Sequence, residues 1–543
     1  MPPSDTTPVG QKRERILGVM IAPVVAPVIV AVIAVCLLAA GLLKLESATH
    51  GLSIVQVREA GVPMTLYRPA GEAPAPVVVI AHGFAGSRQM MQAYAVTLAR
   101  NGYIAVTFDF PGHGRNATPF VADLEDQATR LRILTDALEP AVALGLRQPG
   151  ADGRLALLGH SMAGDVLVRF AQSAQSAESS QSSQSADMPV AASVLVSPYL
   201  STDTDTASLR NLLFVYGDLE PEMLHGQGRA AIAEATGSEV EAGQTYGDPG
   251  DGSARRLVLA PGVEHIGVLY AERALAESLA WLDAAFARSG SGFLDRRGAG
   301  LGLLFLGILA LAWPLSRLLP RVADRPLGAG LSWRRLLPVA IAPAVLTPLV
   351  LWRVPSDFLS IMLGDYLALH FGVYGILTAI GVWLMRPAVP APHGSVSRSA
   401  TAIAILAASV YATLAFAVPT DRFVTALIPG LERLHLVLAI FAGTLVYCLA
   451  DEWATRGSGA ARGGYWLTKL LFLFSLLAAV ALNLNELFFL VIIVPAILVL
   501  FLIYGLLSGW VYRRTRHPAV AAVANAIAFA CAVAVTFPLV AVR

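Results

Sequence analysis

LALLGHSMAGDVL, residues 155–167, runs from an apolar segment through Gly159, His160 and Ser161 back into apolar sequence. The pattern is typical of a strand that turns sharply into a helix, with small residues two before and two after a serine. Such a turn lifts the serine oxygen clear of the backbone, where it can act as a nucleophile. The small residue after the serine is Ala163 rather than the usual glycine, and Gly164 follows it. We therefore take Ser161 as a candidate nucleophile and look to the neighbouring segments.

Short apolar runs alternate with helix-like segments on both sides of this stretch, between about residues 50 and 290. This alternation predicts an α/β fold, with a mostly parallel sheet covered by helices on both faces. The expected strands contain APVVVIAHG, YIAVTFDFPGHG, RLALLGHS, ASVLVSPY, NLLFVYGD and RRLVLAPGVEH. Within this region AQSAQSAESSQSSQSAD, residues 171–187, is polar and repetitive, which predicts a flexible surface insertion.

A nucleophilic serine needs a base to take its proton and a carboxylate to orient that base. His265, in VLAPGVEHIG, follows the last expected strand and is the candidate base. The acid should follow LLFVYG, where YGDLEPE offers Asp218 and Glu220. We prefer Glu220, which directly precedes a proline, and Asp218 stays open as the alternative.

The reaction also needs hydrogen-bond donors for the oxyanion that forms on the attacked carbonyl group. AHGFAGS is a turn after an early strand, where the backbone N–H of Phe84 can join that of Met162, the residue after the serine. Three further histidines, His82, His113 and His160, stand in turns and are expected to be structural, bonding to loop backbone.

The motifs HGFAGS, FDFPGHGR, GHSMAG, YGDLEP and GVEH follow one another in this order. With them the segment resembles the α/β-hydrolases, in the broad group of dienelactone-hydrolase-like esterases and serine peptidases of the prolyl-oligopeptidase type. The resemblance implies a doubly wound, mostly parallel sheet, and the roles given above to Ser161, His265 and Glu220 or Asp218. It does not specify the substrate, because the fold hosts esterases, lipases, peptidases, thioesterases and acyltransferases.

The rest of the chain is strongly apolar: only 14% of the 543 residues are charged, and the mean hydropathy is +0.62. An uncharged apolar run of about 18 residues or more is long enough to cross a bilayer. The first run, residues 16–43, follows three basic residues and is too long for a cleaved signal peptide, which predicts a signal anchor. Eight further transmembrane helices are expected near residues 299–318, 336–352, 364–385, 400–418, 434–451, 465–482, 487–511 and 519–541.

Arginines are unevenly distributed between the loops that join these spans, and short cytoplasmic loops hold the excess of Lys and Arg. If residues 1–15 are cytoplasmic, most arginines after residue 298 fall in cytoplasmic loops. The segment 45–295 then forms an extracytoplasmic α/β-hydrolase domain, and residues 298–543 form a membrane domain of about eight helices that resembles no family we know. The pair Arg296 and Arg297 is a local exception.

Many α/β-hydrolases carry a lid between the strands expected at ASVLVSPY and NLLFVYGD, but here only LSTDTDTASLR separates them. Polar residues of the membrane region gather at its expected outer ends, so we hypothesise that the membrane domain covers the active site instead. These residues are Asp357, Asp365, His370, Asp421, Glu432, Arg433, His435 and Glu486. A cover of this kind favours a lipid-derived or amphiphilic acyl substrate.

The sequence thus predicts a membrane-anchored serine hydrolase, of the carboxylic-ester hydrolase or lipase type, that cleaves an ester through an acyl-enzyme on Ser161. Peptidase activity stays open, as do an acyltransferase with the same acyl-enzyme and a non-catalytic sensor or scaffold attached to a transporter-like membrane domain.

The 39 basic and 38 acidic residues give no reason to expect a nucleic-acid partner. No metal cluster, phosphate loop or nucleotide motif is present, so we expect no cofactor and no metal. The three cysteines lie in apolar runs, where they provide no disulfide framework.

Overall fold

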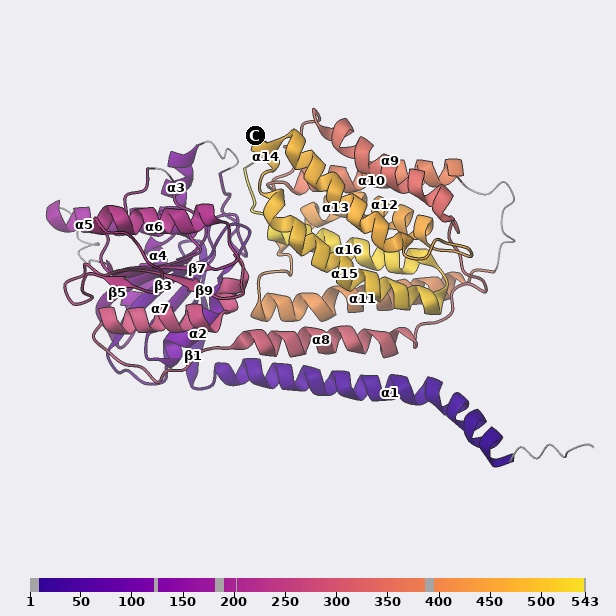
Figure 1. Cartoon of the computed structure of the whole chain (residues 1–543), viewed down its shortest axis with the longest axis horizontal. Coiled ribbons are helices and arrows are strands. Elements are labelled where there is room, and N and C mark those ends of the chain that lie inside the picture. Colours follow the sequence, from indigo (N-terminus) through magenta and orange to yellow (C-terminus); the bar gives the residue numbers. More distant parts are fainter. Residues whose placement is uncertain (1–8, 122–125, 181–189, 202, 386–394, 542–543) are drawn as a thin grey trace, which may run out of the picture.

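The computed structural model describes residues 9–121, 126–180, 190–201, 203–385 and 395–541 (Figure 1). A sheet with helices on both of its faces occupies one end of the molecule, and long helices lie beside one another in the rest. The helix α1 (Val9–Ala48) leads into the sheet, and the chain leaves the sheet through α8 (Arg297–Ser316). These two helices run side by side.

The sheet has nine strands in the order β1-β2-β4-β3-β5-β6-β7-β9-β8. The six central strands, β4-β3-β5-β6-β7-β9, pair with one another in parallel, whereas β1, β2 and β8 pair in antiparallel fashion. This confirms the predicted α/β-hydrolase fold class. The strands are β1 (Leu52–Glu59), β2 (Val62–Pro69), β3 (Ala75–Ala81), β4 (Ile104–Phe108), β5 (Ala151–His160), β6 (Val190–Val196), β7 (Leu212–Gly217), β8 (Thr245–Tyr246) and β9 (Arg255–Ala260).

Successive residues of each buried strand pack against different helices, because side chains alternate between the two faces of a sheet. Val77 and Val79 of β3 lie in the core formed with α3 to α6, whereas Val78 and Ile80 lie in the core formed with α2 and α7. Both faces are buried, which explains the unbroken apolar runs in the sequence. The helices are α2 (Gln92–Arg100), α3 (Gln127–Asp136), α4 (Glu139–Leu146), α5 (Ala163–Ser180), α6 (Glu222–Thr236) and α7 (Glu272–Ala285).

Two features of this region differ from the sequence expectations. The hairpin of β1 and β2 was not predicted, because its side chains mix polar and apolar residues and the burial of its second strand depends on tertiary packing, in which that strand pairs with β4. The expected insertion at 171–187 overlaps α5, which continues to Ser180, while residues 181–189 lie outside the described part of the chain.

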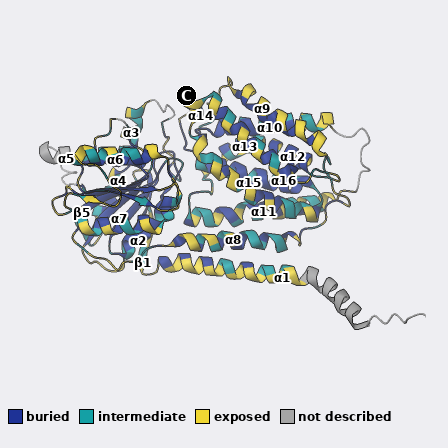
Figure 2. Cartoon of the chain, viewed as in Figure 1, coloured by how far each residue is buried: buried dark blue, intermediate teal, exposed yellow. Residues whose placement is uncertain are grey.

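Nine helices in the described ranges are long and apolar enough to cross a membrane, which indicates a multi-pass membrane protein. Figure 2 shows α1 largely exposed from Val25 onward, whereas two thirds (67%) of the apolar window of α16 is buried among its neighbours. Besides α1 and α8, the helices are α9 (Trp333–Leu351), α10 (Gly364–Met385), α11 (Arg398–Phe423), α12 (Leu434–Thr455), α13 (Gly464–Leu482), the short α14 (Leu484–Leu487), α15 (Leu490–Thr515) and α16 (Pro518–Thr536).

The end of the chain joins the helical bundle to the sheet. After α16, the carbonyl of Leu539 accepts a hydrogen bond from Phe120 N–H at 2.7 Å, and Leu539 N–H donates to Gly112 O at 2.9 Å. The buried Arg433, just before α12, donates to the same Gly112 carbonyl at 2.7 Å and to two carbonyls after residue 533. Two chain segments far apart in sequence therefore meet at the loop that follows β4.

Glycines bring α1 and α8 into close contact. A Cβ atom placed on Gly307 of α8 would lie 2.9 Å from the carbonyl oxygen of Ala34 on α1, and one on Gly41 would lie 2.7 Å from the backbone nitrogen of Leu304. Small residues allow this approach between membrane helices, where packing rather than the hydrophobic effect drives association. Gly302, also on α8, has no atom within 4 Å of such a position.

We expect Gly307→Leu to separate α1 from α8, since the larger side chain must displace backbone, at a cost of about 1–3 kcal/mol. The thermal unfolding midpoint of the detergent-solubilised protein should fall. Gly302→Leu is the matched control and should leave the midpoint unchanged or raise it, because leucine favours helix more than glycine does. Equal midpoints for the two variants would contradict the proposed helix contact.

Candidate active site

Ser161 stands at the sharp turn between β5 and α5. Its φ of +54° lies in the left-handed region that non-glycine residues rarely adopt, and such strain is common at functional sites. Gly159 makes the turn possible, because a Cβ there would lie 2.5 Å from Leu167 and 2.9 Å from the Cβ of Ala163. Alanine is tolerated at 163 because its methyl group faces this bare glycine.

The turn after β3 passes directly over the serine. A Cβ on Gly83 would lie 2.9 Å from the Cβ of Ser161 and 2.8 Å from Nδ1 of His160, so only glycine fits there. The next residue, Phe84, is thereby brought beside the serine. In the described part of the chain, the backbone N–H groups of Phe84 and Met162 make no hydrogen bond to another backbone group.

His265 lies beside Ser161. It sits in the loop after β9, and its Nε2 is 2.9 Å from the serine Oγ. On the other side of the ring, Nδ1 faces Oε2 of Glu220 at 3.6 Å. The His265 side chain is 26% exposed, whereas the carboxylate of Glu220 is fully buried. The structure therefore brings Ser161, His265 and Glu220 into one line.

Glu220 is held in place through its second carboxylate oxygen. Oε1 accepts hydrogen bonds from the hydroxyl of Ser197 and, at 3.3 Å, from the backbone N–H of Gly217. Oε2 has no hydrogen-bond partner and is left for His265. The alternative acid, Asp218, is exposed and accepts a hydrogen bond from Gly262 N–H at 2.7 Å instead. The structure does not bring Asp218 to the histidine.

The three turn histidines bond to backbone. The N–H of Phe110 donates to Nε2 of His82 at 3.1 Å, so the proton sits on Nδ1, which donates to Gly83 O at 2.7 Å. His113 Nδ1 lies 2.8 Å from Pro111 O. Nε2 of His160 donates to the carbonyl of His265 at 2.9 Å and so helps to position the neighbouring ring.

Burial keeps these three imidazoles neutral. It lowers the pKa of His82 below its ordinary value, and it lowers the pKa of His113 and of His160 to about 3. Groups with such a low pKa hold no proton near neutral pH and cannot exchange one easily, whereas a general base should titrate close to the working pH.

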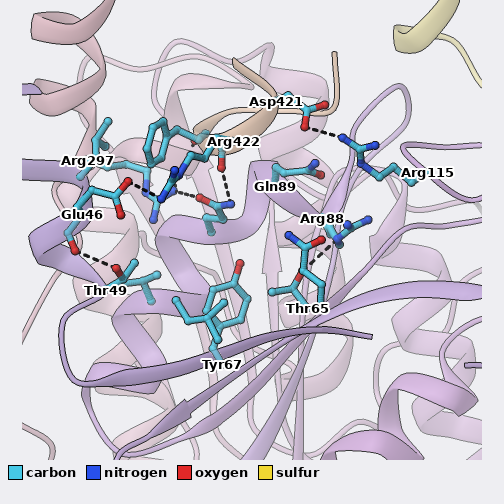
Figure 3. Close-up of a pocket in the computed structure, with 16 residues that line it drawn as sticks. Glu46, Thr49, Thr65, Tyr67, Arg88, Gln89, Arg115, Arg297, Asp421 and Arg422 are labelled. Atoms are coloured by element: carbon cyan, nitrogen blue, oxygen red, sulfur yellow. Dashed lines mark hydrogen bonds and ion pairs between the residues drawn. The ribbon is translucent and has the colours of Figure 1, made fainter. Parts of the chain in front are cut away.

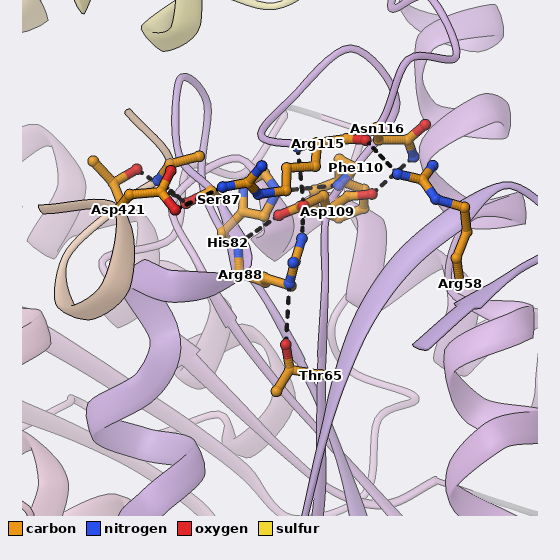
Figure 4. Close-up of polar contacts among 12 residues, drawn as sticks. Arg58, Thr65, His82, Ser87, Arg88, Asp109, Phe110, Arg115, Asn116 and Asp421 are labelled. Atoms are coloured by element: carbon orange, nitrogen blue, oxygen red, sulfur yellow. Dashed lines mark hydrogen bonds and ion pairs between the residues drawn. The ribbon is translucent and has the colours of Figure 1, made fainter. Parts of the chain in front are cut away.

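Asp109, just after β4, organises the two loops that lie against the membrane helices (Figure 4). Its fully buried carboxylate pairs with the Arg88 guanidinium and accepts hydrogen bonds from the backbone N–H groups of Arg88 at 2.7 Å and Arg115 at 3.1 Å. Arg88 Nε donates in turn to Thr65 at 3.0 Å. The loop that carries Phe84 is therefore tied to the loop after β4.

Membrane helices reach both of these loops. The ring of Phe489, just before α15, stacks on Phe84 with 4.2 Å between the ring centroids. Ser87 exchanges a hydrogen bond with Thr425 at 3.0 Å and accepts one from Ala426 N–H at 2.9 Å, both in the loop after α11. The bundle thus contacts the same turn that approaches Ser161.

The polar residues expected at the outer ends of the helices have different positions. Asp421 pairs with Arg115 at 2.6 Å, and Arg433 bonds to Gly112, so these two do contact the sheet domain. Asp365 accepts a hydrogen bond from Phe358 N–H at 3.1 Å, and Glu486 accepts one from Asn483 at 2.7 Å, both within the bundle.

In the part of the chain that the structure describes, no group of three or more His, Cys, Asp or Glu side chains is arranged to hold a metal ion.

Sequence reasoning missed Ser197, Asp109 and Phe489. Ser197 follows β6 with a φ of +45°, and nothing in the run VSPY distinguishes it from an ordinary turn serine. Asp109 belongs to the motif FDFPGHG, in which no local signal distinguishes a buried, paired carboxylate from an ordinary loop aspartate. Phe489 lies in an apolar run where no local signal sets one aromatic ring apart.

Comparison with known proteins agrees with the α/β fold of the sheet domain. Residues 72–233 match the model of the family described as serine aminopeptidase, S33. The curated proteins include no match to the sequence.

Solved structures similar to the sheet domain include a dienelactone hydrolase from Anabaena variabilis, at 17% identity and a TM-score of 0.31, covering 44% of this chain and 100% of that one. A predicted CIB-like hydrolase from Thermoplasma acidophilum has 15% identity and a TM-score of 0.30, covering 44% and 98%. A bacterial membrane phospholipase A, described as a virulence factor, has 16% identity and a TM-score of 0.29, covering 51% and 99%. The predicted resemblance is confirmed: this chain carries an α/β-hydrolase domain, joined to a bundle of apolar helices that no family model matches.

Proposed function

We propose that this protein is a membrane-held serine hydrolase that cleaves an ester through an acyl-enzyme on Ser161. The observation that carries the proposal is the line of three side chains: Ser161 Oγ lies 2.9 Å from Nε2 of His265, with the buried carboxylate of Glu220 behind the ring. A serine, a histidine and a carboxylate in this order are the parts of a nucleophilic triad.

In the first half of the reaction, Ser161 Oγ attacks the ester carbonyl carbon while Nε2 of His265 takes the hydroxyl proton. The tetrahedral intermediate collapses, the bond to the alcohol oxygen breaks, and His265 returns the proton to the leaving alcohol. In the second half, His265 takes a proton from water, the hydroxide attacks the acyl carbon, and the acid is released as Ser161 regains its proton. Glu220 orients the ring and stabilises its charged form.

The oxyanion of each intermediate requires two donors close to the serine. The backbone N–H groups of Phe84 and Met162 are our candidates, because neither donates to another backbone group and the bare Gly83 lets the Phe84 turn approach Ser161. One such donor contributes about 3 kcal/mol to the transition state.

We further propose an amphiphilic or lipid-derived acyl substrate. The strand β6 is followed by only a short connection to β7, which leaves no space for a lid domain. Phe489 of the helical bundle instead stacks on Phe84, the candidate oxyanion residue, with 4.2 Å between the ring centroids. A substrate at Ser161 would therefore lie at the end of the membrane helices, where an acyl chain can stay in an apolar environment.

We propose that the hydrolase domain is extracytoplasmic and that the N-terminus is cytoplasmic. The loops that contact the hydrolase domain lie at one end of the bundle and include those at Asp421, Phe489 and Leu539. Loops at the other end bond to one another, as Val322 N–H does to Thr515 O at 3.1 Å. The arginine-rich sequences 317–335, 456–462 and 513–516 all lie at the end of the bundle away from the hydrolase domain. Their positive charge supports a cytoplasmic location for that end.

Ser161→Ala should abolish labelling of the purified full chain by a fluorophosphonate probe and lower ester hydrolysis on the order of 10³-fold or more, because the attacking oxygen is lost. Gel-based detection of the probe, together with hydrolysis of a chromogenic ester, measures both. A nearby serine with no proposed role, Ser173, provides the control Ser173→Ala. Full labelling of the Ser161 variant would exclude this residue as the nucleophile.

Glu220→Gln should lower kcat on the order of 10²- to 10⁴-fold, because an amide cannot stabilise the charged imidazole. Asp218→Asn is the matched control and should stay within a few-fold of the wild type, since Asp218 bonds to Gly262 N–H rather than to His265. Steady-state kinetics on one ester decide between the two carboxylates. The opposite ranking would assign the acid to Asp218.

Phe489→Ala should lower kcat/KM for a long-chain ester several-fold more than for a short-chain ester, because it removes an apolar wall that only a long acyl chain would contact. Phe488→Ala is the matched control, since this neighbouring ring is 51% exposed and does not stack on Phe84. Kinetics with acetyl and dodecanoyl esters in the same detergent provide the comparison. Equal losses for both chain lengths would rule out the proposed acyl contact.

A further inference from the structure

A cavity of about 500 Å³ lies between the hydrolase domain and the ends of three membrane helices, α1, α8 and α11 (Figure 3). Its walls come from β1 and β2, the turn and helix that begin at Arg88, the end of α1, the start of α8 and the end of α11. None of Ser161, His265 and Glu220 lines it. It is a separate site, and the proposed reaction leaves it unused.

The cavity stands at the level where α1 and α11 leave the apolar part of the bundle. Leu45 and Phe423, at the ends of these helices, line it together with their charged neighbours in sequence, Glu46 and Arg422. Apolar and charged side chains therefore meet in one wall. In a membrane protein this change from apolar to charged residues marks the headgroup region.

Cationic side chains outnumber anionic ones on the walls. Four arginines line the cavity, but only two carboxylates do: the arginines are Arg88, Arg115, Arg297 and Arg422, and the carboxylates are Glu46 and Asp421. The remaining partners, Asp109 of Arg88 and Asp295 of Arg297, are buried behind the wall and do not line it. Arginine is well suited to bind the oxygens of a phosphate group.

Two of these arginines are in ion pairs that a ligand could share. The Arg422 side chain is 63% exposed in its pair with Glu46, and that of Arg115 is 37% exposed in its pair with Asp421. Exposed ion pairs are weak because water competes for both charges. A phosphate entering the cavity could therefore gain hydrogen bonds from both guanidinium groups at little cost.

The walls also contain an acceptor without a donor. Gln89 lines the cavity with its residue only 8% exposed, and its buried Oε1 has no hydrogen-bond partner. In Figure 3 its side-chain amide lies between the Arg88 and Asp421 side chains. A buried unpaired carbonyl is costly, so a ligand that supplies an N–H or O–H donor would be favoured there.

We propose that this cavity binds the headgroup of a single phospholipid whose phosphodiester is followed by an amine or a hydroxyl group. The phosphate oxygens accept hydrogen bonds from Arg115 and Arg422, the terminal donor bonds to Gln89 Oε1, and the acyl chains extend past Leu45 and Phe423 along the membrane helices. Arg88 follows the loop that carries Phe84, so the bound headgroup lies behind the proposed active site without entering it.

The test is binding of a soluble short-chain lipid to the purified full chain in detergent. Dihexanoyl phosphatidylethanolamine is titrated into the wild type and followed by isothermal calorimetry, while native mass spectrometry detects phospholipid retained from the membrane. We expect retained lipid and saturable binding in the wild type. Arg115→Gln/Arg422→Gln should weaken binding about tenfold or more, since two charge-assisted contacts are lost. Gln89→Leu should weaken it several-fold.

Arg353→Gln is the matched control, because Arg353 is an exposed arginine in the loop after α9, at the same end of the bundle but outside the cavity. It should bind lipid as the wild type does. Should the double variant lose its fold, as judged by gel filtration, the exposed single variant Arg422→Gln replaces it and is expected to weaken binding.

Two results would overturn the proposal. One is equal lipid binding by the wild type and by the folded arginine and glutamine variants. The other is binding of glycerophosphoethanolamine or of inorganic phosphate as tight as that of the short-chain lipid, which would make the cavity a site for a soluble anion. Neither readout depends on ester hydrolysis, so this proposal and the proposed function can fail independently.

Discussion

The buried carboxylate of Asp109 is the contact on which the arrangement of the molecule depends. A charge removed from water is costly unless it is paired and fully hydrogen-bonded, and this one has the Arg88 guanidinium and two backbone N–H groups around it. These partners belong to the turn after β3 and the loop after β4. Removing the carboxylate would leave a buried guanidinium unpaired and release both loops at once.

Those two loops form the contact surface for the membrane helices. Ser87, one residue before Arg88, bonds to the loop after α11, and Phe84 stacks on Phe489. On the other loop, Arg115 pairs with Asp421, and Gly112 accepts from Arg433. A single buried ion pair in the sheet domain thus supports the surface on which the bundle docks.

The membrane helices contact the sheet domain at the turn that approaches Ser161. The connection between β6 and β7 is short, and the side chains that cover the turn beside Ser161 come from sequence more than 300 residues away, at Thr425 and Phe489. The membrane helices are therefore a structural part of the candidate site. This gives one physical reason for a hydrolase domain to be joined to so many helices.

The amino-acid sequence by itself determined the features that depend on local periodicity and sterics. Unbroken apolar runs identified the six central strands, because both faces of the sheet are buried, and long uncharged runs identified nine helices able to span a bilayer. The small residues around Ser161 indicated a tight turn, since only such residues allow its backbone geometry. The same signals were silent on the hairpin of β1 and β2, in which the burial of the second strand depends on tertiary packing.

Only the tertiary structure decided which side chains meet. Asp218 and Glu220 are two residues apart and both carry a carboxylate, yet one bonds to Gly262 and the other faces His265, because the turn after β7 brings them to different partners. The contact of Phe489 with Phe84 and the cavity between α1, α11 and β2 likewise join segments hundreds of residues apart. No periodicity records such contacts, since they depend on how completed elements pack rather than on how each one forms.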